Sequence, residues 1–249
     1  MPPGYLRALL FTDPAIVVLT VVMGSISLAT SLFDRNGRRQ HRIARFWSRM
    51  LLRVCGVKMR VEGVEKITPD CCFVLAANHC SLMDTPVVLG YMPVQFRFFA
   101  KKVLFRIPFL GTHLRRSGHL PVVREDPRAS IKSLSEGARI IRENKVSVLL
   151  FPEGSRSENG KLKDFKEGAA YIAIKAGVPV IPIAIVGTAE VLPIKSMHIR
   201  PGRVSLLVGD PIPTAGLKLQ SRGPLTQQIR EAIGKMLAEA TCPKLSKTL

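Results

Sequence analysis

The sequence Cys72-Phe73-Val74-Leu75-Ala76-Ala77 is apolar throughout and predicts a strand that is buried on both faces. Strands of this kind lie in the centre of α/β sheets, where helices cover both sides. The chain continues as Asn78-His79-Cys80-Ser81-Leu82-Met83-Asp84, which places a histidine and a carboxylate directly after the predicted strand. Because α/β sheets bind ligands at the carboxyl ends of their strands, a functional site is expected here.

His79 and Asp84 have the side chains that general base catalysis needs. A neutral imidazole accepts a proton from a hydroxyl near pH 7, and a carboxylate on its other ring nitrogen fixes the tautomer. Five residues along a straight helix give a net rotation of about 140°, so the two side chains meet only if His79 lies in the turn and Asp84 enters the next helix. A structural alternative is that His79 bonds to backbone and Asp84 caps a helix beginning near Thr85-Pro86.

A second polar stretch follows another apolar run. Val146-Ser147-Val148-Leu149-Leu150 predicts a buried strand, and Phe151-Pro152-Glu153-Gly154-Ser155-Arg156-Ser157 follows it. This stretch would bring a glutamate, a glycine, hydroxyl groups and an arginine to the same edge of the sheet. We interpret the two stretches as parts of one site.

The two stretches resemble the first and third motifs, N-H-x-S-x-x-D and F-P-E-G-[TS]-R-S, of the 1-acylglycerol-3-phosphate acyltransferase (lysophosphatidate acyltransferase) family. The family's second motif is similar to Lys101-Lys102, Ile107-Pro108-Phe109-Leu110-Gly111 and Val123-Arg124, and its fourth to the proline-rich run 178–185. The resemblance spans about residues 60 to 210 and includes four motifs in order.

The resemblance implies an enzyme of phospholipid biosynthesis and lipid metabolism. It would move a fatty acyl group from a thioester to the sn-2 hydroxyl of 1-acyl-sn-glycerol 3-phosphate (lysophosphatidic acid), giving phosphatidic acid. His79 would be the general base and Asp84 its orienting partner. The expected substrate-binding residues are Asn78, Ser81, Lys101, Arg124, Glu153, Gly154, Ser155 and Arg156. The donor is acyl-CoA or an acyl-carrier-protein thioester, and neither a cofactor nor a metal is expected.

The acceptor's phosphate gives the basic residues of these motifs a role. Arg156 can hold the dianion in a two-point fork, while Arg124 and Lys101 add positive charge. Glu153 is expected to bond the glycerol hydroxyl or to position Arg156.

Alternative chemistries have weaker support in the sequence. No G-x-S-x-G, phosphate-loop or dinucleotide fingerprint occurs. Cys80 adjoins His79, but neighbouring side chains in a turn usually point apart, so we expect direct transfer in a ternary complex without an acyl-enzyme. A backbone N–H near Ser81 or in the Gly154 loop is the candidate donor to the oxyanion.

Composition indicates an anionic partner. The chain has 249 residues, a formal net charge of +19 and a pI near 10.4, with a mean hydropathy of +0.19. Three tyrosines and one tryptophan are few for a nucleic-acid binder of this basicity, and no nucleic-acid module is recognisable. An anionic membrane surface is therefore the expected partner, together with the lipid acceptor and the anionic donor.

The segment Pro14 to Phe33 has no charge and is about as long as a transmembrane helix. Glycine, serine and threonine residues dilute its apolarity, so a shallow or re-entrant helix is an alternative to a full span. A basic flank follows, with Arg35, Arg38, Arg39, Arg42 and Arg45. By the positive-inside rule this flank is cytoplasmic, which predicts location in the cell inner (cytoplasmic) membrane with the catalytic domain facing the cytoplasm.

From Gln40 to Cys55, apolar residues recur at steps of three and four and predict an amphipathic helix. This helix either lies in the membrane interface or packs on the domain's own core, and the two readings are compatible. The expected organisation is a membrane segment with a basic helix over residues 1–55 and a cytoplasmic acyltransferase domain over residues 56–249.

The rest of the chain alternates strands and helices. Further strands are predicted at 57–61, 95–100, 119–124, 180–186 and 204–208. Helices are predicted at 85–92, 126–143, 169–176 and 224–240. The segment Lys101 to Arg116, broken by Pro108 and Gly111, is expected to be a loop or lid. The helix over 126–143 is expected to turn Ile131, Leu134, Ala138 and Ile141 to the core. The fold class is α/β, with a central mostly parallel or mixed sheet flanked by helices and an N-terminal membrane-associated helical segment.

Two other functions remain open at the level of sequence. One is a member of the same family that acylates another lysolipid or an amino-acid lipid. The other is a non-catalytic protein that binds anionic membranes.

Overall fold

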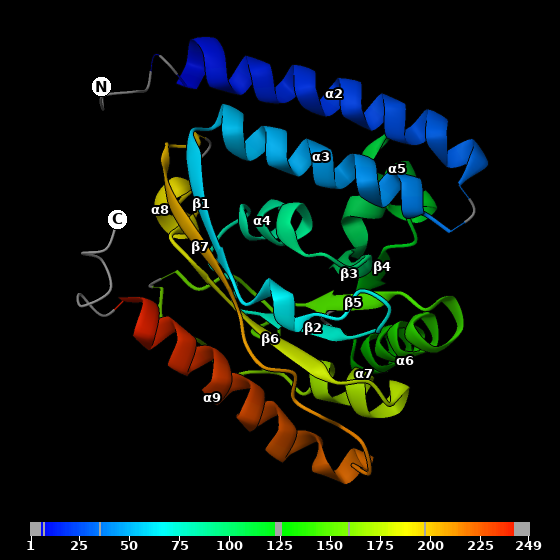
Figure 1. The fold of residues 1–249 in the computed structure, drawn as a ribbon. Coiled ribbons are helices and arrows are strands. Elements are labelled where there is room, and N and C mark those ends of the chain that lie inside the picture. Colours follow the sequence, from blue (N-terminus) through cyan, green and yellow to red (C-terminus); the bar gives the residue numbers. More distant parts are fainter. Residues whose placement is uncertain are drawn as a thin grey trace.

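The computed structural model describes residues 6, 8–34, 36–122, 126–158, 160–196 and 198–241. Arg35, Val123 and Arg124, named above, lie outside this part of the chain. A seven-stranded sheet in the order β1-β7-β6-β2-β5-β3-β4 forms the centre (Figure 1). Its strands are β1 (Val57–Glu62), β2 (Val74–Ala77), β3 (Phe96–Lys101), β4 (Leu120–Val122), β5 (Ser147–Leu150), β6 (Val180–Val186) and β7 (Gly202–Val208). Neighbouring strands are parallel except β6 and β7, which confirms the predicted mixed, mostly parallel sheet.

Helices cover both faces of the sheet. They are α2 (Asp13–Thr30), α3 (Arg38–Val54), α4 (Asp84–Tyr91), α5 (Leu110–Arg116), α6 (Pro127–Asn144), α7 (Gly168–Ala176), α8 (Thr188–Val191) and α9 (Arg222–Thr241). In Figure 1, α3 and α4 lie above the sheet with α2 outermost, and α6, α7 and α9 lie below it. Each face has its own apolar core, with Leu52, Val88 and Leu75 in one and Ile141, Ile172 and Ile229 in the other.

The central strands are buried because both faces are covered. Every residue of β2 is buried, as are the first six residues of β6, whereas β7 alternates in burial nearer the edge. β2 pairs with β5 on one side and β6 on the other, with Val74 opposite Val148 and Val180. The apolar run 72–77 therefore contains β2, the middle strand of the sheet.

The N-terminal apolar segment is helical and exposed. The helical stretch Ala8–Phe33 is long enough to cross a membrane, and an 18-residue window within it has a mean hydropathy of 2.2. Only 6% of that window is buried. One side of α2 packs along α3, where the Trp47 indole N–H donates to the Thr20 hydroxyl at 3.2 Å. Apolar side chains left in contact with solvent indicate membrane association.

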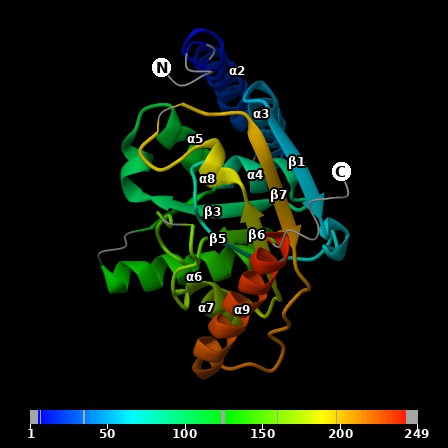
Figure 2. The ribbon, with the colours of Figure 1, turned by 90° about the vertical axis from the view of Figure 1, so that its left-hand side faces the viewer.

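Two predictions of detail are wrong. Lys101–Arg116 is not a loop, because it contains the short 3-10 helix Lys102–Arg106 and α5. Gly111 permits this compact turn, since a Cβ there would lie 2.2 Å from the Phe105 carbonyl oxygen. Ile131 is 55% exposed instead of facing the core. The first turns of α6 pack against β4, the edge strand of the sheet, where the Ser133 hydroxyl donates to the Pro121 carbonyl at 2.9 Å. Figure 2 shows α6 at the periphery of the fold.

Candidate active site

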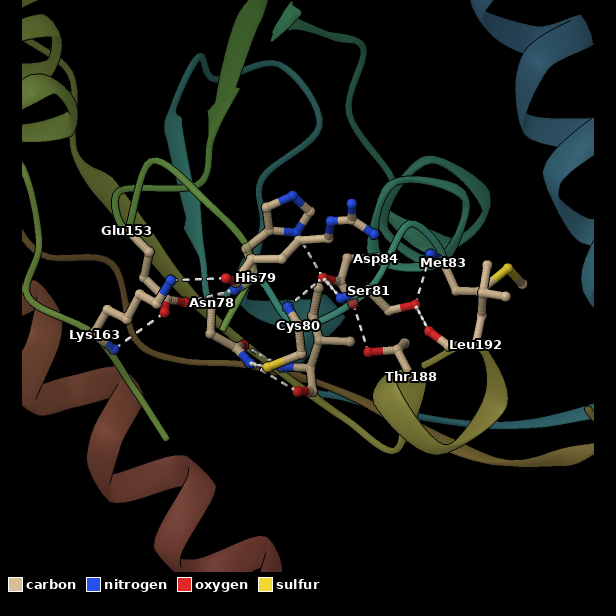
Figure 3. A network of polar contacts seen from close by, with 12 residues as sticks. Asn78, His79, Cys80, Ser81, Met83, Asp84, Glu153, Lys163, Thr188 and Leu192 are labelled. Atoms are coloured by element: carbon tan, nitrogen blue, oxygen red, sulfur yellow. Dashed lines mark hydrogen bonds and ion pairs between the residues drawn. The ribbon is translucent and has the colours of Figure 1, made fainter. Parts of the chain in front are cut away.

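Three neighbouring strands end beside one another and carry the site. β2, β5 and β6 are adjacent and parallel, so their carboxyl ends meet at one edge of the sheet. His79 lies two residues beyond β2, Glu153 three residues beyond β5 and Thr188 two residues beyond β6. The structure therefore brings the two sequence motifs together and adds a third segment at the start of α8 (Figure 3).

His79 and Asp84 form the polar centre of the site. Nδ1 of His79 lies 2.7 Å from Oδ2 of Asp84. The pair meets in the way that the helix geometry required, since His79 lies in the turn and Asp84 is the first residue of α4. Because Nδ1 faces the carboxylate, Nε2 is the ring nitrogen left to accept a proton.

The buried carboxylate of Asp84 accepts four hydrogen bonds. Besides the imidazole, Oδ2 receives the backbone N–H groups of Cys80 at 2.7 Å and Ser81 at 2.8 Å. Oδ1 receives the hydroxyl of Thr188 at 2.5 Å. Four donors fix the orientation of the carboxylate and offset the cost of removing it from water.

Phe151 fixes the plane of the imidazole. Its ring stacks on His79 with centroids 4.1 Å apart and planes inclined by 17°. As a result only 15% of the His79 side chain is exposed. Phe151 also lines a cavity of 150 Å³, together with Phe99, Val122, Ser130, Leu134, Leu149, Leu150, Pro152, Gly154, Lys166, Gly168 and Ala169. A mostly apolar recess therefore adjoins the His79–Asp84 pair through the Phe151 ring.

Glu153 joins the two polar loops. Its side chain is buried, and its carboxylate accepts the backbone N–H of His79 at 2.7 Å and of Lys163 at 3.1 Å. The Ser157 N–H donates in turn to the His79 carbonyl at 2.8 Å. The partners of Glu153 are thus backbone groups of the site itself, and the Arg156 guanidinium is not among them.

Asn78 and Ser81 bond to the neighbouring segment of chain. The Asn78 side chain accepts from the Ile185 N–H at 2.7 Å and donates to the Ile185 carbonyl at 2.9 Å. The Ser81 hydroxyl donates to the Leu192 carbonyl at 2.8 Å and accepts from the Met83 N–H. Both side chains are buried, so they tie the first motif to β6 and to the end of α8.

The rest of the third motif forms an open turn. Gly154 has a φ of +72°, a conformation that favours glycine. Ser155 is exposed, and the Lys163 ammonium donates to its hydroxyl at 3.1 Å and to the Arg156 carbonyl at 2.8 Å. Within the described part of the chain, the Arg156 guanidinium pairs with no carboxylate. This arginine is therefore available to an anionic ligand.

Lys101, another predicted cation, is further from the His79–Asp84 pair. Lys101 is the exposed last residue of β3, which is separated from β2 by β5. Because β3 runs parallel to β5 and β2, Lys101 lies at the edge of the sheet where the carboxyl ends of these strands meet. Arg124 lies outside the described residues.

The structure bears on the oxyanion donor and on Cys80. The N–H groups of Ser81 and Gly154 themselves donate to Asp84 and to the Phe151 carbonyl, so the prediction of an oxyanion donor applies to the other N–H groups of these two loops. For Cys80, burial and the nearby carboxylates raise the pKa of the thiol to about 11. The thiol is therefore protonated at neutral pH and is a poor nucleophile.

Thr188 and Lys163 are site residues that the sequence reasoning missed. Thr188 follows Gly187 directly after the buried strand β6, so it occupies the position relative to its strand that His79 occupies relative to β2. The hydroxyl of Thr188, two residues after a buried strand, was the sequence signal that could have identified it as a site residue. Lys163 had none, because its backbone N–H forms the contact with Glu153.

Comparison with known proteins gives a consistent result. A family model described as Acyltransferase matches residues 58–186. The chloroplastic 1-acyl-sn-glycerol-3-phosphate acyltransferases of Brassica napus and Arabidopsis thaliana are each 34% identical to the chain, over 79% and 73% of it and 57% and 51% of their own lengths. The chain thus spans about half the length of these relatives.

A solved structure extends the likeness to nearly the whole chain. The crystal structure of the 1-acyl-sn-glycerophosphate (LPA) acyltransferase PlsC from Thermotoga maritima matches with a TM-score of 0.80 and 28% identity. The match covers 94% of this chain and 96% of that one. The family model covers more than half of the sequence, and the fold agrees over almost all of it. The chain belongs to the acyltransferase family that includes the 1-acyl-sn-glycerol-3-phosphate acyltransferases.

Proposed function

We propose that the protein transfers a fatty acyl group from a thioester donor to the sn-2 hydroxyl of 1-acyl-sn-glycerol 3-phosphate, giving phosphatidic acid. The observation that carries this proposal is the 2.7 Å hydrogen bond between His79 Nδ1 and Asp84 Oδ2. It leaves Nε2 as a base, and Phe151, which stacks on the imidazole, also lines a mostly apolar recess that suits a fatty acyl group. Family membership supports the same reaction class.

In the proposed mechanism, His79 acts as the general base. Nε2 takes the proton of the sn-2 hydroxyl while the oxygen attacks the thioester carbonyl. The charge on the resulting imidazolium is stabilised by Asp84. Collapse of the tetrahedral intermediate breaks the C–S bond, and the proton on Nε2 passes to the leaving thiolate. Atoms and charges balance without an acyl-enzyme.

The acceptor's phosphate is proposed to bind the basic residues of the second and third motifs. Arg156 is free of carboxylate partners in the described chain and can make two parallel bonds to phosphate oxygens. Lys101 and Arg124 would add positive charge at the same edge of the sheet. These contacts would place the sn-2 hydroxyl near His79 and favour phosphate-bearing acceptors.

The remaining predicted residues are proposed to shape the substrate site. Asn78, Ser81 and Glu153 act through the loops that they hold, since their polar atoms bond within the protein. Gly154 and Ser155 form the turn next to Arg156, where backbone can approach a substrate closely.

Exposed apolar and basic side chains support association with an anionic membrane. In the N-terminal helical stretch and in the segment 103–110, the exposed apolar side chains include Leu9, Leu10, Phe11, Val17, Val18, Val21, Val22, Ile26, Leu32, Phe33, Val103, Ile107, Phe109 and Leu110. The exposed apolar side chains of α2 and of the segment 103–110 form one surface, because Gly24 of α2 packs against the Phe109 ring. A 560 Å³ crevice at the α2–α3 turn is lined in part by Arg38, Arg39 and Arg42, and none of these forms an ion pair with a described carboxylate. Such a surface suits acyl chains beside phosphates.

We therefore assign residues 1–55 to the membrane-associated segment and residues 56–249 to the acyltransferase domain. The positive-inside rule supports an inner (cytoplasmic) membrane location with the acyltransferase domain on the cytoplasmic side. The donor is an acyl-CoA or an acyl-carrier-protein thioester. Both are anionic and match the net charge of +19.

The experiment compares donors and acceptors with the full-length protein in detergent. Labelled acyl-CoA and acyl-carrier-protein donors are each paired with 1-acylglycerol 3-phosphate and with 1-acylglycerol, which lacks the phosphate. We expect kcat/KM to be at least about 100-fold higher for the phosphate-bearing acceptor, and Arg156→Ala to remove most of that preference. Equal rates with both acceptors would exclude lysophosphatidate recognition, and the donor with the higher kcat/KM is the preferred one.

A further inference from the structure

Thr188 reaches the catalytic carboxylate from a segment that neither polar sequence motif includes. Its side chain is 1% exposed, and Oγ1 donates to Asp84 Oδ1 at 2.5 Å across a separation of 104 residues. No other described donor bonds to Oδ1, whereas Oδ2 has three donors. The position of Oδ1 therefore depends on this one hydroxyl.

The local backbone is built to place Thr188 there. Gly187 has a φ of +90°, and a Cβ at this position would lie 2.2 Å from the Arg203 carbonyl oxygen, so the turn out of β6 favours glycine. The chain turns sharply and starts α8 with Thr188. At the other end of α8, the Leu192 carbonyl accepts the Ser81 hydroxyl at 2.8 Å. α8 is thus fixed to the His79 loop at both ends, as Figure 3 shows.

The Thr188 hydroxyl completes the set of donors that holds the carboxylate. Without it, Oδ2 keeps its three donors, but the buried Oδ1 has none among the described residues. The carboxylate is then held through one oxygen alone, and its angle toward His79 Nδ1 is less restrained. A bond from a neutral donor to a carboxylate also stabilises its charge, which is the charge that must balance the imidazolium during transfer.

We propose that Thr188 is a positioning residue of the acyl-transfer reaction and acts through Asp84 to hold the His79 imidazole in its basic tautomer and orientation. This inference rests on the proposed function. Thr188 keeps its own proton throughout, and the proton that moves is the one passed from the acceptor hydroxyl to Nε2. The active site then consists of three segments, from the ends of β2, β5 and β6.

The first test separates catalysis from substrate binding. Thr188→Val keeps the shape of the side chain and removes the hydroxyl. We expect kcat to fall roughly ten- to one-hundred-fold, as loss of a hydrogen bond to a charged group implies, with both KM values within about two-fold of wild type. Thr188→Ser restores the hydroxyl and should recover at least half of the wild-type kcat. A Thr188→Val rate within two-fold of wild type, or an inactive Thr188→Ser variant, would overturn the proposal.

The matched control is Thr214→Val. Thr214 is also buried, and its hydroxyl donates to the Val178 carbonyl at 2.9 Å, away from the active site. The same substitution there removes an equivalent buried hydroxyl and should lower stability without lowering kcat. If both variants lose kcat equally, Thr188 acts only through stability and the inference fails.

A second readout does not depend on turnover. The His79 Nδ1 proton, bonded to Asp84, should give a low-field proton resonance in the NMR spectrum of the protein in detergent. We expect this resonance to move in Thr188→Val, to return in Thr188→Ser and to stay in place in Thr214→Val. An unmoved resonance in Thr188→Val would overturn the link from Thr188 to His79. If wild type acylates no lysophosphatidate, the proposed function fails while this readout still decides the role of Thr188.

Discussion

Replacing Glu153 by glutamine tests whether one carboxylate holds the two polar loops together. Glu153 is 5% exposed and accepts the backbone N–H groups of His79 and Lys163 at 2.7 and 3.1 Å. Glutamine has nearly the same shape but only one acceptor oxygen, so its NH2 group faces an N–H that it cannot accept. One buried donor is left without an acceptor, which costs about 1–3 kcal/mol.

This cost is large enough to measure. For a chain of this size about 1 kcal/mol shifts the melting temperature by roughly 2–4 °C, so Glu153→Gln should melt roughly 2–12 °C below wild type. The kcat for phosphatidate formation should fall as well, because the displaced loop carries the His79 backbone. The KM for lysophosphatidate should stay within about two-fold of wild type.

The assay is thermal unfolding in detergent together with initial rates over a range of acceptor concentrations. Glu158→Gln is the matched control, since this exposed glutamate lies in the same loop and the change removes the same charge. We expect it to behave as wild type. An unchanged melting temperature for Glu153→Gln, combined with a raised KM, would show that Glu153 meets the substrate and would refute the reasoning.

Three further predictions concern single side chains. Cys80→Ala should keep at least half of the wild-type initial rate, because burial and the neighbouring carboxylates raise the pKa of this thiol to about 11 and it cannot serve as a nucleophile. Gln40→Met should raise the free energy of unfolding by about 1–2 kcal/mol in denaturant titrations, since the buried Gln40 amide has no hydrogen-bond partner among the described residues. Burial and nearby arginines lower the pKa of His41 to about 3. Unfolding therefore takes up a proton at His41 below pH 6.5, so the contribution of His41 to stability is fully present above that pH and falls by about 2 kcal/mol between pH 7 and pH 5. Burial also lowers the pKa of His113 and His119, so the protein as a whole loses more than this on acidification. Denaturant titrations at both pH values should show a loss about 2 kcal/mol smaller in His41→Leu than in wild type.

The sequence predicted the centre of the fold because the signals there are local. The run 72–77 has no polar residue, which favours a strand covered on both faces, and its residues 74–77 form β2 in the middle of the sheet. The spacing of His79 and Asp84 required a turn followed by a helix start, and α4 begins at Asp84. Turn chemistry and periodicity are sufficient for features of this kind.

Other features depend on contacts between distant parts of the chain. The position of Ile131 depends on where the sheet ends beneath α6, which no periodicity reports. The bond from Thr188 to Asp84 joins residues 104 positions apart. The motif predicts that Glu153 bonds the glycerol hydroxyl or positions Arg156, yet its partners are backbone N–H groups, which carry no residue-type signal. The residue types in the sequence were therefore sufficient to locate the site. The role of each residue within it could be read only from three-dimensional contacts.

The most direct test of the account is the rate of phosphatidate formation by wild type, His79→Ala and Asp84→Asn, measured side by side with the preferred thioester donor. His79→Ala removes the base, and Asp84→Asn replaces a buried acceptor of four hydrogen bonds. We predict that each folded variant loses at least about 100-fold in kcat, in the range that general base catalysis contributes. A His79→Ala variant that retains a rate within ten-fold of wild type would contradict the assignment of His79 as the base.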